Sequence, residues 1–363
     1  MPAKKTPAAK QVVYLWGAGA TQADVSYTGV AGVNLLMGND PTLGEGVAAR
    51  VLSQLSKKWK PESPTGTETD IEKFISLLAA SNTSKHSQLA DRLRKKYFED
   101  IRDNLAKTSI LTAPKLAMGL LLLHRRPSFA THEQLAGILT TNHDGLLQVA
   151  AQQVTSGVNI GMPFSATDLT ADDATTPMIH LHGSFTWRFG LPLSVSPLTA
   201  DSVYDPDTVW IPPTVIKDSK YYPFNKLAGR AYELLSRSCD VLRVVGSGLT
   251  QNDWHLVSMI FNAQRHREMT KRRAFRIELI LPHPLGMGIS SRSSYLKNVV
   301  PIGFLTEGQF DPYKDPNDPL RTPEMDNQLF YWLREKIQYH KQRGELGAEP
   351  LHQVLGEIIG EAA

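Results

Sequence analysis

The sequence predicts an α/β fold: a Rossmann-like parallel sheet with helices on both faces, plus an all-helical insert and a C-terminal helix. Apolar runs of strand length alternate with helical patterns along most of the 363 residues, and this alternation is typical of parallel sheets covered on both sides. The first apolar run, residues 12–16, leads directly into Gly17 and Gly19, whose conformational freedom suits a tight turn from strand to helix. A hydrophobic content of 41% is enough for a large core.

The order of the elements follows from the same patterns. Residues 44–124 read as helical throughout, which predicts an insert at about residues 42–130, and Thr69 and Glu72 have the spacing of a capping box within it. Residues 310–321 are rich in Asp and Pro and predict a linker, and 327–343 predict one amphipathic helix appended to the core. We therefore expect a disordered tail at 1–10, a main Rossmann domain at 11–310, and a linker with a helical extension at 311–363. Strand-like runs between insert and linker lie at 135–142, 178–183, 207–213, 240–248, 276–282 and 298–305.

The composition excludes several kinds of site. The single cysteine, Cys239, cannot form an intramolecular disulfide or a zinc site built on several cysteines, and we expect no metal site. The net charge is only +3, and the basic run at 265–273 falls at the predicted end of a helix, where cations complement the helix dipole. We therefore expect no direct binding of nucleic acid. The apolar run at 116–123 is too short to span a membrane, and the N-terminus lacks a signal-peptide core, which predicts a cytoplasmic protein without a membrane contact.

Four predicted loops carry glycine or polar residues directly after strands. In a parallel α/β sheet the carboxyl ends of the strands meet at one edge, where such proteins bind their ligands, so we expect these loops to converge. A full G-x-G-x-x-G fingerprint would need a glycine at position 22, where Gln22 stands, so the generic dinucleotide signal is incomplete. The four loops are GAGAT (17–21), TTNHD (140–144), HLHGS (180–184) and GSGLTQND (246–253).

In this order the four loops resemble the sirtuin superfamily, and the resemblance covers residues 12–305. It implies that the protein binds NAD+, with the glycine loop on the pyrophosphate, and that Asn142 and His182 are catalytic at the nicotinamide ribose. An amide that orients water or ribose and an imidazole that accepts a proton suit the cleavage of a glycosidic bond through an oxocarbenium-like state. The further residues that the resemblance places around NAD+ are Gly17, Ala18, Gly19, Thr21, Asp144, Gly183, Gly246 and Ser247.

Two of these assignments have alternatives. Asn142 also has the type and place of a residue that caps the helix beginning at Gly145. His180 and His182 stand two residues apart on one predicted strand, so both should face the same side of the sheet. We take His182 as catalytic because the adjacent Gly183 leaves its ring open, and His180 as a buried supporting histidine.

The sequence also departs from the family that it resembles. Family deacetylases carry a zinc module of four cysteines, which this chain cannot form with Cys239 alone. Their Pro-Asp-Phe-Arg element after the glycine loop is replaced here by DVSYTGVAGVN at 24–34, which leaves the roles of Asp24 and Tyr27 open. Gly248 stands where a serine that contacts ribose is common, so Ser247 or the backbone must make that contact.

A zinc-free chain with a helical insert is similar to the sirtuin-like subunits of bacterial anti-phage defence systems. That resemblance implies an NAD+ hydrolase that releases nicotinamide and ADP-ribose and so depletes NAD+ in an infected cell. It also implies a separate sensor subunit, either a HerA-type ATPase or an Argonaute-like protein. The aromatic residues Tyr331, Trp332 and Tyr339 on the last predicted helix predict a homo-oligomer contact there. Two alternatives stay open: an NAD-dependent protein deacylase or ADP-ribosyltransferase, and a non-catalytic assembly subunit that binds NAD or ADP-ribose.

Overall fold

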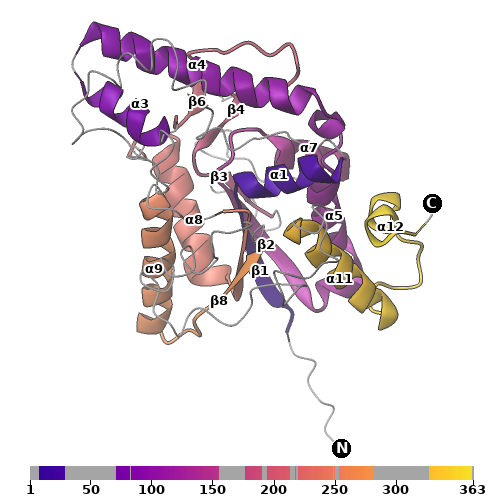
Figure 1. The fold of residues 1–363 in the computed structure, drawn as a ribbon. Coiled ribbons are helices and arrows are strands. Elements are labelled where there is room, and N and C mark those ends of the chain that lie inside the picture. Colours follow the sequence, from indigo (N-terminus) through magenta and orange to yellow (C-terminus); the bar gives the residue numbers. More distant parts are fainter. Residues whose placement is uncertain are drawn as a thin grey trace, which may run out of the picture.

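The centre of the protein is a five-stranded parallel sheet with the strand order β3-β2-β1-β7-β8 (Figure 1). The structure is a computed structural model that describes residues 8–28, 71–81, 83–154, 176–189, 194–212, 217, 220–247, 249, 253–280 and 327–361. The expected α/β class is confirmed. The strands of this sheet are β1 (Lys10–Trp16), β2 (Glu133–Thr140), β3 (Met178–His180), β7 (Val241–Val245) and β8 (Arg276–Ile280).

Strand β1 occupies the middle of the sheet because its residues are apolar on both faces. It pairs in parallel with β2 on one side and with β7 on the other, and every residue from Val12 to Trp16 is buried. The chain adds β2 and β3 on one side of β1 and then returns to add β7 and β8 on the other side. This reversal creates a switch point between the carboxyl ends of β1 and β7, which is where open α/β sheets bind ligands.

Helices cover both faces of the sheet, and the alternation of β1 side chains determines which core each residue joins. Val12, Tyr14 and Trp16 pack with α1 (Ala18–Tyr27), α5 (Lys115–Arg125) and α7 (Leu146–Val154). Val13 and Leu15 pack on the other face with α8 (Phe224–Ser238) and α9 (Trp254–Met269). Figure 1 shows the two groups of helices on opposite sides of the strands.

The described part of the insert is helical, as expected. It consists of α3, α4, a short 3₁₀ turn, α5 and α6, and α4 lies above a second, antiparallel sheet with the order β5-β4-β6 (Figure 1). The sequence predicts a strand at 207–213; the structure places β6 there, but in this smaller sheet and not in the parallel one. The bounds are α3 (Ile71–Ala80), α4 (Ser84–Ala106), α6 (Pro127–Ala130), β4 (Gly183–Arg188), β5 (Ser194–Val195) and β6 (Thr208–Trp210).

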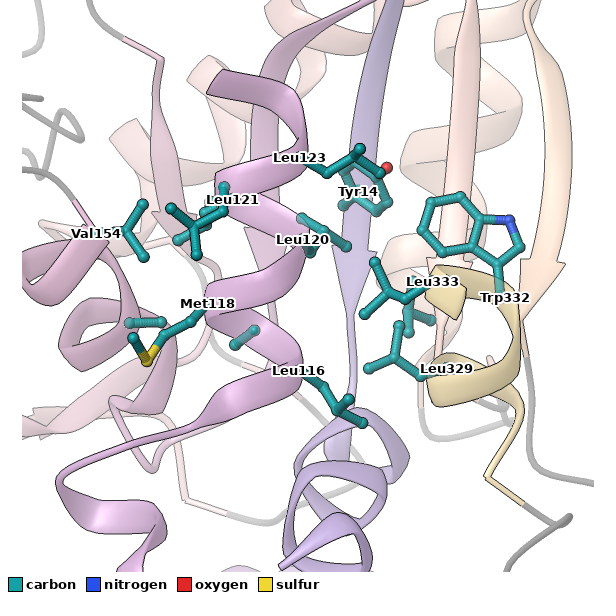
Figure 2. Packing of buried hydrophobic residues seen from close by; sticks show 14 of the residues in the cluster. Tyr14, Leu116, Met118, Leu120, Leu121, Leu123, Val154, Leu329, Trp332 and Leu333 are labelled. Atoms are coloured by element: carbon teal, nitrogen blue, oxygen red, sulfur yellow. The ribbon is translucent and has the colours of Figure 1, made fainter. Parts of the chain in front are cut away.

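The chain ends in two helices that belong to the main core. They are α11 (Gln328–Gln342) and α12 (Gln353–Ile359). The sequence predicts one appended helix here; the structure instead buries the apolar side of α11 against β1 and α5 and adds α12 beside it. Figure 2 shows Trp332 and Leu333 beside Tyr14 of β1, and Leu329 nearer Leu116 of α5. The apolar face of α11, with Trp332 in it, therefore completes this core, whereas Tyr339 on the same helix is exposed, and an oligomer contact through this helix stays a prediction.

Several expectations lie outside the described residues. These are the tail at 1–7, the insert before residue 71 with its capping box, the strand at 298–305 and the linker at 311–326. Among the helices that the structure describes, none is by itself long and apolar enough to cross a membrane. Two successive helical segments, Ser84–Ala106 and Ser109–Arg125, are long and apolar enough only when taken together, and the chain bends by 97° between them.

Candidate functional site

The four loops that follow the strands lie against one another at the carboxyl edge of the sheet. The loop after β1 contacts the loop after β7, where Gly17 N–H donates to Val245 O at 2.9 Å and Gly19 N–H donates to Gly246 O at 2.8 Å. The loop after β3 contacts the loop after β2, where Leu181 N–H donates to Thr140 O at 2.8 Å. Backbone hydrogen bonds thus hold the loops in pairs around the switch point.

Glycines at the switch point allow two backbones to touch. A Cβ on Gly246, which has φ of +61°, would lie 2.0 Å from Ala20 N, and one on Gly19 would lie 2.8 Å from Gly246 O. Side chains at either position would push the loops apart, since real Cβ atoms do not approach backbone so closely. In this turn Ala18, the first residue of α1, is exposed, whereas Gly17 and Gly19 are buried. Gly248 lies outside the described residues.

Asn142 joins the loop after β2 to the glycine turn. Its Nδ2 donates to Gly17 O at 3.1 Å and to Thr21 Oγ1 at 2.9 Å, and the Thr21 hydroxyl donates in turn to Asp144 Oδ2 at 2.8 Å. These bonds point the NH₂ group of the amide toward the glycine turn, which leaves its oxygen on the other side. The alternative in which Asn142 caps the next helix does not describe this structure, because Asp144 accepts the N–H of Leu146 at 3.0 Å and makes that cap.

His182 lies in the turn between β3 and β4, and its ring meets a second histidine. His182 Nε2 is 2.8 Å from Nε2 of His255 in the first turn of α9, so one ring donates to the other. The ring of His143 stacks near His182 with centroids 6.0 Å apart, and His143 Nε2 lies 3.1 Å from Ile211 O. Three imidazoles from three segments therefore share one buried region.

Burial keeps these imidazoles neutral. It holds the pKa of His182 well below its usual range, and the positive charge of Lys217 and the neighbouring rings of His255 and His143 act in the same direction. Burial likewise lowers the pKa of His255 to about 4 and that of His143 to about 3. At neutral pH, His182 and His255 are thus a neutral pair that can accept a proton and share it across one hydrogen bond.

His180 is separate from this group. The sequence predicts that His180 and His182 share a strand and a side of the sheet; the structure ends β3 at His180, so the two rings face different neighbours. His180 Nε2 lies 3.2 Å from Gln148 Nε2, and its ring packs at 5.4 Å from that of Trp187. Only 1% of His180 is exposed, and burial lowers its pKa to about 4. These contacts fit the supporting role expected of it.

Gly183 allows two strands to pack closely. Its φ is +73°, and a Cβ there would lie 2.2 Å from Val209 O on β6. The glycine therefore lets β4 approach β6, and the expectation that it also leaves the His182 ring open stays a prediction. Ser247, in the loop after β7, is also buried. A Cβ added to Gly17 would lie only 2.6 Å from the Cβ of Ser247, so these two loops are in close contact here as well.

Asp24 and Tyr27, whose roles the sequence leaves open, contact neighbouring helices. The two carboxylate oxygens of Asp24 accept the N–H groups of Leu116 and Ala117, each at 2.9 Å, so Asp24 caps helix α5. Burial raises the pKa of this carboxyl group to about 7, although the two backbone donors oppose the shift. The ring of Tyr27 packs on Phe330 of α11 with centroids 5.3 Å apart. Both residues connect α1 to its neighbours.

Sequence reasoning missed His255. It lies two residues beyond the end of the GSGLTQND loop, at the start of the following helix. A search for histidines just after each glycine-containing loop would have found it, because helices that follow parallel strands begin at the ligand-binding edge of the sheet.

Comparisons with known proteins add little to this geometry. No protein-family model matches the chain, and no curated protein matches it. Among the solved structures that are similar is a chain described as "Structural Basis for the Mechanism and Regulation of Sir2 Enzymes", with 12% sequence identity and a TM-score of 0.40, over 92% of this chain and 94% of that chain. A similarity of this size carries no argument about activity, so the inferences below rest on the residues themselves.

Proposed function

We propose that the protein is an NAD+ hydrolase of the sirtuin superfamily, which converts NAD+ to nicotinamide and ADP-ribose without a zinc module. One observation supports this proposal most strongly. The amide of Asn142, fixed to the glycine turn, and the neutral His182–His255 pair lie on loops that meet at the switch point of a parallel sheet. An amide, a base and a helix N-terminus are the groups that cleavage of a nicotinamide–ribose bond requires.

The glycine turn supplies the binding part of this function. Helix α1 begins at Ala18, which is exposed, and the positive end of its dipole favours a pyrophosphate there. Gly17 and Gly19 use their own N–H groups to hold the loop after β7. They shape the turn, and the exposed N-terminal end of α1 at Ala18 is the part that contacts the phosphates.

The reaction needs one bond broken, one bond formed and one proton moved. The bond between the ribose C1′ and nicotinamide breaks through an oxocarbenium-like state, and nicotinamide leaves as a neutral base. Water adds to C1′, and its proton passes to the neutral imidazole of His182, with His255 holding that ring in place. Asn142 orients the ribose or the water with its amide oxygen, while Thr21 and Asp144 hold the amide in place.

The biological part of the proposal rests on the motif order alone. We propose that the hydrolase is an effector of bacterial anti-phage defence that acts by depleting NAD+. A constantly active NAD+ hydrolase would harm its own cell, so its activity should depend on assembly. The proposed partners are further copies of the chain and a separate sensor, of the HerA-type ATPase or Argonaute-like kind.

Nicotinamide release from NAD+ tests the proposal. We expect Asn142→Ala and His182→Ala each to lower the rate by about 10²- to 10⁴-fold, because each removes a group that acts in the transition state. His180→Ala should keep a substantial part of the activity, and thermal unfolding of each variant shows whether it is folded. The same assay with an acetylated peptide separates hydrolysis from deacylation.

Two outcomes would contradict the assignment. Unchanged nicotinamide release in the double variant would place the chemistry elsewhere. If the wild-type chain, alone and in its native assembly, bound NAD+ or ADP-ribose without releasing nicotinamide, the binding-subunit alternative would replace the hydrolase.

A further inference from the structure

A second cluster of histidine and carboxylate groups lies at the opposite edge of the sheet from the four loops. It consists of His132, His340 and Glu345. His132 directly precedes β2, so it lies about 25 Å, the length of that eight-residue strand, from the loop that carries Asn142. His340 is in the last turn of α11, and Glu345 follows that helix. The cluster therefore joins the C-terminal helices to the core and is distinct from the proposed hydrolase site.

Backbone structure places all three side chains. Helix α11 ends in a Schellman motif, in which Gly344 has φ of +69°, its N–H donates to Lys341 O at 2.9 Å, and Glu345 N–H donates to His340 O at 2.8 Å. This motif turns the chain back on itself and sets Glu345 beside His340. His132 is fixed separately, because its N–H donates to Phe129 O and its carbonyl accepts Lys10 N–H, both at 2.9 Å.

The donor atoms have the spacing of ligands around one ion. Glu345 Oε2 lies 2.8 Å from His340 Nδ1 and 3.5 Å from His132 Nε2, and the donor atoms of the three side chains all lie within 4.8 Å of one another. Two ligands at about 2.1 Å from a tetrahedral ion are themselves about 3.4 Å apart. Small side-chain rotations would thus bring the three atoms to bonding distance of a common centre.

We propose that His132, His340 and Glu345 bind a divalent transition-metal ion, with Zn²⁺ as the best match. Two imidazoles and one carboxylate suit Zn²⁺ and its neighbours, whereas Mg²⁺ and Ca²⁺ prefer oxygen ligands alone. The His132 side chain is 44% exposed, so the ion can enter from solvent and keep water as a fourth ligand. This departs from the expectation of no metal site, which rested on the lack of cysteines.

Arg343 is compatible with this site. Its Nε donates to Glu345 Oε1 at 2.5 Å, so it occupies the carboxylate oxygen that faces away from the imidazoles. Oε2 remains directed at both histidines. When an ion binds, the hydrogen bond between His340 and Oε2 is replaced by two metal bonds, and the single proton of neutral His340 resides on Nε2.

Titration of the metal-free full chain with Zn²⁺ tests the proposal. We expect one saturable site by calorimetry and a rise in the unfolding temperature, because an ion bound only to the folded state stabilises it. His132→Gln, His340→Gln and Glu345→Gln should each weaken Zn²⁺ binding by at least about tenfold, since each removes one of the three protein ligands. His86→Gln on α4 is the matched control and should bind as the wild type does.

His132→Gln is the decisive variant, because His132 is exposed and its loss should not prevent folding. Wild-type affinity in this folded variant would overturn the proposal and leave the cluster as a helix-capping ion pair. Binding that survives in His132→Gln but is lost in His255→Gln would also overturn it, by assigning the ion to the other histidine pair. Equal stabilisation by Mg²⁺ would contradict the transition-metal assignment.

Discussion

Asn142, Thr21 and Asp144 show how single residues at this site depend on one another. The Thr21 hydroxyl accepts from Asn142 and donates to Asp144, and Asp144 also accepts the N–H of Leu146. All three side chains are largely removed from water, and a buried polar group that loses its partner costs roughly 1–3 kcal/mol. Each residue therefore keeps the next in one orientation, which is the preorganisation that a catalytic amide needs.

The lowered pKa of His182 predicts the pH dependence of nicotinamide release. A base acts in its neutral form, and burial keeps His182 neutral to a lower pH than a free histidine. The rate constant kcat/KM should therefore stay flat as the pH falls from 8 to 6.5 and decline only below the usual histidine pKa. A pH series of kcat/KM checks this, and an acidic limb centred at or above pH 6.5 would contradict it.

At the scale of elements, the site depends on how the loops after β1 and β7 pack. Their contact is made by backbone against backbone, with Gly246 against Gly19 and Ala20. Neither loop has room for a side chain at the contact. The two strands belong to opposite halves of the sheet, so these glycines determine how closely the halves meet at the switch point.

This packing predicts opposite effects for two glycine substitutions. Gly246→Ala should lower the free energy of unfolding by more than about 2 kcal/mol, because the new Cβ collides with backbone at a positive φ. Gly229→Ala, within α8, meets nothing within 4 Å and should raise stability by about 0.5 to 1 kcal/mol. Denaturant unfolding of both variants measures the difference, and equal effects would show that the loops are not in contact as described.

At the scale of the whole molecule, the C-terminal helices complete the core. Trp332 of α11 lies edge-on to Tyr14 with ring centroids 6.3 Å apart, and the guanidinium of Arg243 lies 5.0 Å from the Trp332 ring. Arg243 is buried in the central sheet and pairs with Glu133 of β2 and Glu278 of β8. Helix α11 therefore covers a charged group that the sheet alone would leave open to water.

Two aromatic substitutions on α11 test this organisation. Trp332→Ala should lower the free energy of unfolding by about 3 to 5 kcal/mol, the usual cost of deleting a buried aromatic ring. Tyr339→Ala on the same helix should change it by less than about 1 kcal/mol, because Tyr339 is 53% exposed. If both variants unfolded at the same denaturant concentration, α11 would be a peripheral helix after all.

The sequence predicts the parallel sheet well and the C-terminal region poorly, for a physical reason. Strand 12–16 is buried on both faces, so an unbroken apolar run marks it, and 241–245 is apolar except for Arg243. The amphipathic pattern of α11 shows that it has an apolar face but not which surface covers that face, and α12 has only seven residues. His255 was missed because its link to His182 spans 73 residues and depends entirely on the packing of loops.

The central position of β1 has a consequence for synthesis. The backbone N–H of Gln11 pairs with the Asp240 side chain 229 residues away, and at 5–20 residues per second a ribosome needs about 10 to 50 seconds to cover that distance. For that time the apolar strand is without one neighbour, so nascent chains are exposed to aggregation and are candidates for chaperone binding. The glycine turn likewise has no partner loop until residues 245–246 have emerged. The proposed NAD+ site is therefore incomplete for most of the time that the chain is being translated.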